Sequence, residues 1–157
     1  MAEEKESAAS FQLEVATPER LVLRVAATEA EIPALLGYIG MRPGHARLAG
    51  EIGAGPLTWS APENAAREPA AAAGRPAKLI LGGGFVEITA DKAVILADAA
   101  EWPGDIDPAR ALAALERAQE GERSTDPNVD HIAAARHVQH ARARLAAREE
   151  YTREHSR

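Results

Sequence analysis

The sequence contains no cysteine, and aromatic residues make up only 4% of its 157 residues. The absence of cysteine excludes disulfide bridges, thiolate metal ligands and cysteine nucleophiles. No apolar run approaches the roughly 20 residues that a membrane-spanning helix requires. Residues 1–10 are acidic and polar, which is not the pattern of a secretory signal peptide. These absences favour a globular protein in a cytosolic, reducing compartment.

The sequence is rich in alanine, and its charged residues are unevenly distributed along the chain. Alanine supplies 36 of the 157 residues, so the core must be built from Val, Ile, Leu and closely packed Ala. The net charge of −6 argues against a general nucleic-acid binder. Residues 131–157 hold six Arg and three Glu, so this end carries +3 and residues 1–130 carry −9. Such asymmetry indicates a C-terminal segment that seeks an acidic partner.

The first two thirds of the chain carry strand and turn signals. Residues 11–15 alternate apolar and polar side chains, the period of a half-buried strand. Glycine and proline then recur every few residues between 33 and 56, which is typical of short strands in a sandwich or small barrel. Residues 61–77 contain three prolines and an alanine run, which predict a loop or hairpin extension. Three later strands are predicted at residues 78–81, 85–89 and 93–98, with three glycines separating the first two.

The pattern changes to helical near residue 105. Asp107 followed by Pro108 predicts a helix start, because Asp accepts the first free amides and Pro suits the first helical position. A polar turn follows at 124–128, and Asn128 or Asp130 can cap a second helix that runs to about residue 150. Two helices on a short connection predict an antiparallel hairpin. The predicted α+β organisation is a disordered leader (1–10), a β-sandwich domain (11–101), a helical hairpin (105–150) and a tail (151–157).

The apolar stripe of the predicted hairpin consists mostly of alanine. Leu112 and Leu115 stand among alanines in the first helix, and the second helix repeats an apolar position at Ile132, Ala135, Val138, Ala141 and Leu145. An alanine seam buries little area, although alanine keeps each helix intact when separated. We therefore expect a hairpin that can detach; the alternative is a hairpin that simply rests on the domain surface.

Familiar enzymatic motifs are absent. The sequence has no GxxxxGK[ST], HExxH or GxSxG motif, and GGGFVEI leads into a strand rather than a helix. His131, His137 and His140 lie on one predicted helix, but no cysteine supports them and arginines surround them. We interpret them as solvated helix-face histidines and expect no metal site.

One cluster of residue types does suggest a ligand. The predicted hairpin places Arg110 and Arg117 on one helical face, and Arg144 or His140 can approach it from the other helix. Arginine forks suit a polyphosphate, and Asp107 or Glu101 could accept hydrogen bonds from adenine or ribose. The alternative is that Asp107 only caps its helix and the arginines pair in solvent with Glu116 and Glu120.

Several ordered blocks resemble the epsilon subunit of the F-type ATP synthase, the mitochondrial delta homologue. The blocks are FQLEVATPERLVL (11–23), GYIGMRPGHARL (37–48), GGGFVEI (82–88), AVILADAAE (93–101) and IDPARA (106–111). The resemblance implies a sandwich of about ten strands beside the gamma shaft and the c-ring. It also implies a non-catalytic rotor subunit at the cytoplasmic face of the bacterial inner membrane. The resemblance further implies that, as in bacterial members of the family, the hairpin can open, extend toward the alpha/beta subunits and suppress ATP hydrolysis.

The resemblance also implies site residues. No cofactor is required, but regulatory ATP bound to the folded hairpin would contact Glu101, Ile106, Asp107, Arg110, Ala111, Arg117, His140 and Arg144. His140 stands where nucleotide-binding members have Arg, which should lower phosphate affinity because His is mostly neutral at pH 7. The implied c-ring and gamma interface includes Tyr38, Arg42 and His45. Tyr38 departs from the family's Glu, and Arg47 from its Pro.

Two other functions stay open at this stage. One is a free-standing ATP-binding regulatory module that shares the fold without belonging to a rotor. The other is an enzyme that uses the Arg and Asp cluster, which the missing nucleophile and metal motifs argue against.

Overall fold

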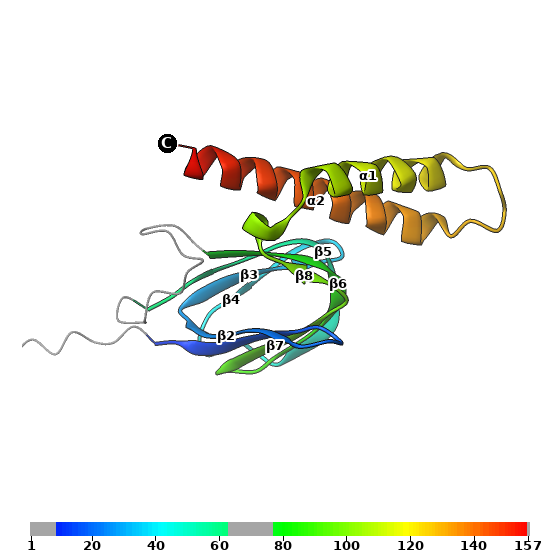
Figure 1. Cartoon of the computed structure of the whole chain (residues 1–157). Helices are drawn as coiled ribbons and strands as arrows, with labels where there is room; N and C mark the ends of the chain where they lie inside the picture. The colour runs from blue at the N-terminus through cyan, green and yellow to red at the C-terminus, as the bar shows by residue number, and fades with distance from the viewer. Residues whose placement is uncertain (1–8, 63–76, 157) are drawn as a thin grey trace, which may run out of the picture.

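The computed structural model describes residues 9–62 and 77–156, which form a β-sheet domain followed by two helices (Figure 1). Most of the predicted leader and loop, residues 1–8 and 63–76, lie outside the described residues. The strands are β1 (Phe11–Ala16), β2 (Leu21–Ala27), β3 (Glu29–Ala34), β4 (Gly37–Met41), β5 (Leu48–Ser60), β6 (Ala77–Ile88), β7 (Lys92–Ala97) and β8 (Ala100–Glu101). A short 3-10 turn, η1 (Pro103–Asp105), leads to α1 (Pro108–Arg123) and α2 (His131–His155). The predicted α+β class is confirmed.

The strands form one sheet that folds over itself into two layers (Figure 1). The strand order is β2-β1-β7-β6-β5-β3-β4, and β8 pairs with the first part of β6. β1 and β7 are parallel, and the other neighbours are antiparallel. β5 and β6 pair over almost their whole lengths, so these two long strands form the central pair of the sheet.

The glycines within β6 lie inside one continuous strand where the sequence predicts two, and the described residues form eight strands in all. The sequence predicts that residues 82–84 separate two strands, but β6 continues through them and bends. Before the bend β6 pairs with β8, and after it β6 pairs with β7. Gly84 has a φ of +130°, and a Cβ atom there would lie 2.1 Å from the Leu96 carbonyl oxygen. Only glycine fits this bend, so the glycines redirect the strand instead of ending it.

The sandwich core is aliphatic, as the composition predicts. Alternate residues of β1 (Phe11, Leu13, Val15) point inward and are buried. Two of the few aromatic side chains, Trp59 and Trp102, meet edge to face with centroids 6.1 Å apart where the sandwich approaches the helices. No polar or charged residue is buried within residues 9–62 and 77–156.

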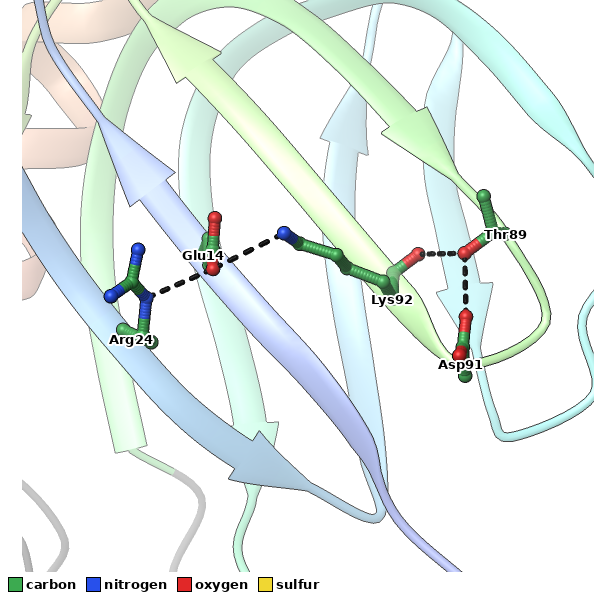
Figure 2. Close-up of polar contacts among 5 residues, drawn as sticks. All are labelled: Glu14, Arg24, Thr89, Asp91 and Lys92. Atoms are coloured by element: carbon green, nitrogen blue, oxygen red, sulfur yellow. Dashed lines mark hydrogen bonds and ion pairs between the residues drawn. The ribbon is translucent and has the colours of Figure 1, made fainter.

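Charged side chains join three strands on the outer face of the sheet. The Glu14 carboxylate of β1 accepts a 2.9 Å hydrogen bond from Arg24 Nε of β2 and lies 3.2 Å from Lys92 Nζ of β7 (Figure 2). Partial burial acts to raise the pKa of Glu14, but the hydrogen bonds and positive charges of Lys92 and Arg24 outweigh it and lower the pKa below 4.5. In the adjacent turn, the Thr89 hydroxyl donates to Asp91 Oδ1 at 3.0 Å (Figure 2).

The helices begin where the sequence predicts. Asp107 Oδ1 accepts hydrogen bonds from the amides of Ala109 and Arg110, and Asp130 caps α2 through the amide of Ala133. α2 runs to His155, beyond the predicted end near residue 150. The extra turn contains no glycine or proline, and Tyr151 stacks on His155 at 4.0 Å between centroids. Residues 151–155 are therefore helical rather than part of a tail.

The two helices pack through small residues, as predicted, but not along all the predicted positions. The buried helical residues are Ala111, Ala118, Ala134, Val138, Ala141 and Ala147. Ile132 is 71% exposed, Leu112 is 49% exposed and Ala135 is also exposed, so these three predicted stripe positions face solvent. A separate small core joins the hairpin to the sandwich: Ile80 of β6 packs with Ile106, Ala111 and Ala147. Among the described residues, neither helix combines the length and the hydropathy needed to cross a membrane.

Candidate functional site

A shallow groove of about 300 Å³ lies between α1 and α2. It is lined by Ala114, Arg117, Ala118, His137, His140, Ala141 and Arg144. Alanines form its apolar part, and arginine and histidine supply the polar groups. Arg117, His140 and Arg144 therefore meet in one place, as the sequence predicts for an anion site.

The arginine of α2 in this groove already has an anionic partner. Arg144 Nη2 donates a 3.1 Å hydrogen bond to Glu101 Oε1, and Arg144 Nε lies 2.6 Å from Glu101 Oε2. The Arg144 and Glu101 side chains are only 16% and 33% exposed, so little solvent screens the pair. The ion pair ties α2 to β8, and a phosphate group would have to compete with Glu101 for the guanidinium.

His140 does not face solvent as expected for a helix-face histidine. A Cβ atom added at Gly82 would lie 3.2 Å from His140 Cε1 and 3.4 Å from its Nε2, so the imidazole packs on the glycine segment of β6. His140 Nε2 is buried and has no hydrogen-bond partner in the described part of the chain. Burial first, then the positive charge of Arg144, lowers the pKa of His140, with Glu101 acting in the opposite direction. His131 and His137 are exposed, as predicted.

The remaining predicted nucleotide contacts are not brought into the groove. Asp107 caps α1 with its side chain. Ile106 and Ala111 are buried against Ile80. Arg110 is exposed and does not line the groove. Within residues 9–62 and 77–156, neither Arg110 nor Arg117 forms an ion pair with Glu116 or Glu120, so of the simpler alternative only the capping by Asp107 is seen.

Further contacts of α2 with the sandwich have no signal in the sequence. Arg148 Nη1 donates to the carbonyl of Gly104 in η1, and Lys78 pairs with Glu150. The Tyr151 ring packs on Gly104, where a Cβ atom would lie 3.0 Å from the ring Cζ. Nearer the start of α2, Arg136 Nη2 lies 3.0 Å from Glu51 Oε1 of β5. Because each pair joins residues far apart in sequence, no local pattern could have indicated them.

Of the residues expected at the c-ring and gamma interface, Tyr38 and Arg42 are exposed and His45 is half-buried. Tyr38 lies near the start of β4 and is paired with Pro33 of β3. Arg42 follows the end of β4, and its Nε and Nη2 donate to Glu29 Oε2 at 3.1 and 2.8 Å. His45 lies in the next turn, with Nδ1 2.6 Å from the Ala46 carbonyl oxygen. At about 3.3 Å per strand residue, Tyr38 and Arg42 are roughly 13 Å apart along the strand, a separation that a single protein interface spans.

Two exposed apolar features were not singled out in the sequence. Leu35 and Leu36 form the β3–β4 turn beside Tyr38, and Leu36 is fully exposed. Phe85 of β6 and Leu96 of β7 are direct cross-strand neighbours on the outer face, and both are more than half exposed. Exposed apolar clusters mark surfaces that contact other proteins. The described residues contain no group of His, Asp and Glu arranged to hold a metal ion.

These features define a two-domain protein in which a β-sandwich carries a docked helical hairpin. Both parts match a known family in order: the sequence profile described as ATP synthase, Delta/Epsilon chain, beta-sandwich domain matches residues 10–103. The profile for the long alpha-helix domain of the same chain matches residues 105–149. The chain belongs to the ATP synthase delta/epsilon chain family.

Individual relatives are similar over most of their length. The ATP synthase epsilon chain of Solibacter usitatus is 40% identical over 137 residues, covering 87% of this chain and 94% of the relative. The epsilon chain of Moorella thermoacetica is 37% identical over 139 residues, covering 88% and 96%. A chain in the Euglena gracilis mitochondrial ATP synthase structure shares the fold with a TM-score of 0.70 at 19% identity, covering 94% of this chain and 86% of that one. The resemblance noted in the sequence blocks is thereby confirmed.

Proposed function

We propose that this chain is a non-catalytic central-stalk subunit of an F-type ATP synthase, which connects the gamma shaft to the c-ring and restrains ATP hydrolysis through its hairpin. The observation that carries the proposal is the match of both domains, in order, to the delta/epsilon chain family. Membership implies a place at the cytoplasmic face of the bacterial inner membrane, held there by the complex. The chain itself would make and break no phosphate bond.

The exposed apolar surfaces support the role in assembly. The β3–β4 turn presents Leu35, Leu36 and Tyr38 at one corner of the sandwich, a suitable surface for the c-ring. The Phe85 and Leu96 pair presents a second apolar surface, suitable for the gamma shaft. Burial of such side chains would stabilise a complex by about 25 cal/mol for each Å² of apolar area removed from water.

The construction of the hairpin supports the regulatory role. Its helices meet through alanine, and it is held to the sandwich by a small apolar core and a few ion pairs. Separating these surfaces exposes little apolar area, so release costs less than separating leucine-rich helices would. The six arginines and three glutamates of residues 131–157 give the released segment a charge of +3, which suits an acidic surface of the alpha/beta subunits.

Native mass spectrometry of the protein mixed with the gamma subunit of its own organism tests the central-stalk role. We expect a one-to-one complex, and a Leu36→Ser variant should keep this complex while weakening assembly with the c-ring. Failure to bind gamma under conditions where the protein is folded would contradict the proposal. That outcome would favour the free-standing ATP-binding module, provided that an added nucleotide mass is seen.

Regulatory ATP binding is the finer part of the proposal. The cationic groove with Arg117, Arg144 and His140 supports it, and binding would require Arg144 to exchange Glu101 for phosphate. Calorimetric titration should show that Arg117→Ala lowers ATP affinity by about tenfold or more, since a hydrogen bond to a charged group contributes about 1.5–3 kcal/mol. Arg123→Ala, on the same helix but outside the groove, is the matched control. Arg110→Ala tests whether the residues that the sequence groups together or the residues that line the groove bind ATP. If only the groove residues bind it, this variant should keep the ATP affinity of the parent chain.

A further inference from the structure

His140 lies at the contact between the hairpin and the sandwich, where its imidazole occupies the space that a side chain at Gly82 would fill. The glycine segment of β6 leaves space above Gly82, and the His140 ring occupies it beside the Ala99 methyl group. The Gly82 amide donates to the Ala99 carbonyl oxygen, so this stretch of backbone is already paired. His140 Nε2 therefore points into a region that offers no acceptor among the described residues.

The charged groups around this ring disfavour the protonated, positively charged imidazole. On α2, Arg144 lies one turn after His140, and His137 lies one turn before it; Arg117 lines the same groove from α1. The acid beside the ring is Glu101 of β8, which Arg144 already engages at 2.6 and 3.1 Å. Asp98, in the turn before β8, lies against Gly83, and Glu51 of β5 pairs with Arg136. Positive charge thus dominates the side of the ring that faces the groove.

We propose that His140 makes docking of the hairpin sensitive to protons: the hairpin docks while the His140 imidazole is neutral and is released when the imidazole takes up a proton. A protonated ring in the docked state would bury an N–H donor on Nε2 without an acceptor, next to the guanidinium of Arg144. Release of α2 removes both penalties, because solvent then hydrates the ring and separates the charges.

The direction of the pH effect follows from the lowered pKa of the docked histidine. Docking is fully stable above the ordinary value of about 6.5, where the imidazole is neutral in both states. As the pH falls below that value, the released state takes up a proton and the docked state does not, so docking weakens. Linkage of one proton limits the change to about tenfold in the docking equilibrium for each pH unit, until the docked histidine also titrates. The inference rests on the contacts of the hairpin with the sandwich and not on membership in a rotor.

The experiment uses the full-length chain with a donor and an acceptor dye on Q12C and T125C, which are unique because the natural sequence has no cysteine. Gln12 lies on β1, Thr125 lies in the connection between the helices, and both side chains are exposed. Urea-induced release of the hairpin is followed through the separation of the dyes at pH values from 8.0 to 5.5. We expect the release equilibrium to rise as the pH falls below 6.5, by up to about tenfold per unit.

Two substitutions and one titration make the test specific. H140Q cannot take up a proton, so its release equilibrium should not change over this range, whereas H137Q, which removes the exposed neighbour, should retain the response. An equal response in H140Q, or none in the parent chain, would overturn the proposal.

An NMR titration of the parent chain covers the case in which H140Q fails to dock at pH 8.0. His140 should titrate below the ordinary histidine value of about 6.5, and titration at or above that value would overturn the proposal. Binding to gamma, measured separately, reports on the central-stalk role.

Discussion

Arg144 of α2 and Glu101 of β8 form a paired contact in which Arg144 Nη2 donates to Glu101 Oε1 at 3.1 Å and Arg144 Nε lies 2.6 Å from Glu101 Oε2. This contact has two consequences for the hairpin. It holds α2 on the sandwich, and it occupies the arginine that a nucleotide would need. The same two residues therefore connect docking of the hairpin to the charge of the groove.

Glu101→Gln should weaken docking of the hairpin by about 1–3 kcal/mol, because it leaves the half-buried Arg144 guanidinium without a compensating charge. Amide hydrogen exchange along α2 at pH 7.5 measures the effect. Glu51→Gln is the matched control: it breaks the more exposed pair with Arg136, whose side chains are 39% and 54% exposed, and should change exchange by less than about 1 kcal/mol. Equal effects of the two substitutions would show that the Arg144 contact has no special role.

The small residues of the hairpin core give a second prediction. Ala111 is fully buried against Ile80, Ile106 and Ala147, so Ala111→Leu would force a larger side chain into a filled space. We expect a loss of about 1–3 kcal/mol of docking stability. Ala109→Leu, on the exposed side of the same helix, should be nearly neutral because leucine is a good helix former. Limited proteolysis between the helices and the sandwich distinguishes the two variants, and similar cleavage rates would contradict the prediction.

The bend of β6 gives a third prediction. Gly84→Ala combines a φ of +130° with a Cβ position 2.1 Å from the Leu96 carbonyl oxygen. The backbone of β7 would have to move, and we expect a loss of about 3 kcal/mol or more, or failure to fold. Gly50→Ala is the control, because its Cβ meets nothing within 4 Å and its φ is ordinary. Urea unfolding followed by tryptophan fluorescence measures both, and a tolerated Gly84→Ala would show that the bend is not fixed by this contact.

Local patterns predicted the parts of the fold that local physics determines. The alternation of residues 11–15 and the caps at Asp107 and Asp130 depend on neighbouring residues, and the structure has them, whereas the alanine seam is present at only some of its predicted positions. The glycines at 82–84 gave the wrong boundary, because whether glycine ends or bends a strand depends on the pairing of β6 with β5 and β7.

The candidate site could be predicted only in part, for the same reason. The sequence placed Arg117, His140 and Arg144 together because helical spacing and an antiparallel hairpin suffice for that. It could not place Glu101 on Arg144 or His140 over Gly82, since both contacts depend on how the hairpin docks on a distant strand. Arg110 stayed outside the groove because the α1 positions that face α2 are alanines further along the helix.

Glu14 predicts how the sandwich responds to acid. Partial burial acts to raise the pKa of Glu14 in the folded state, but Lys92 and Arg24 lower it by more. The folded state therefore binds a proton less readily than the unfolded chain. The contribution of Glu14 is therefore fully present above its unfolded pKa of about 4.5 and is lost as the pH falls through the lower folded value. Glu14→Gln should remove this part of the acid sensitivity, so that the variant loses less stability than the parent chain between pH 5 and pH 3. Urea unfolding at each pH measures the difference, with Glu19→Gln, an exposed acid in the neighbouring turn, as the control. Parallel pH profiles for the parent chain and Glu14→Gln would show that the bridge between β1, β2 and β7 (Figure 2) does not favour the ionised carboxylate.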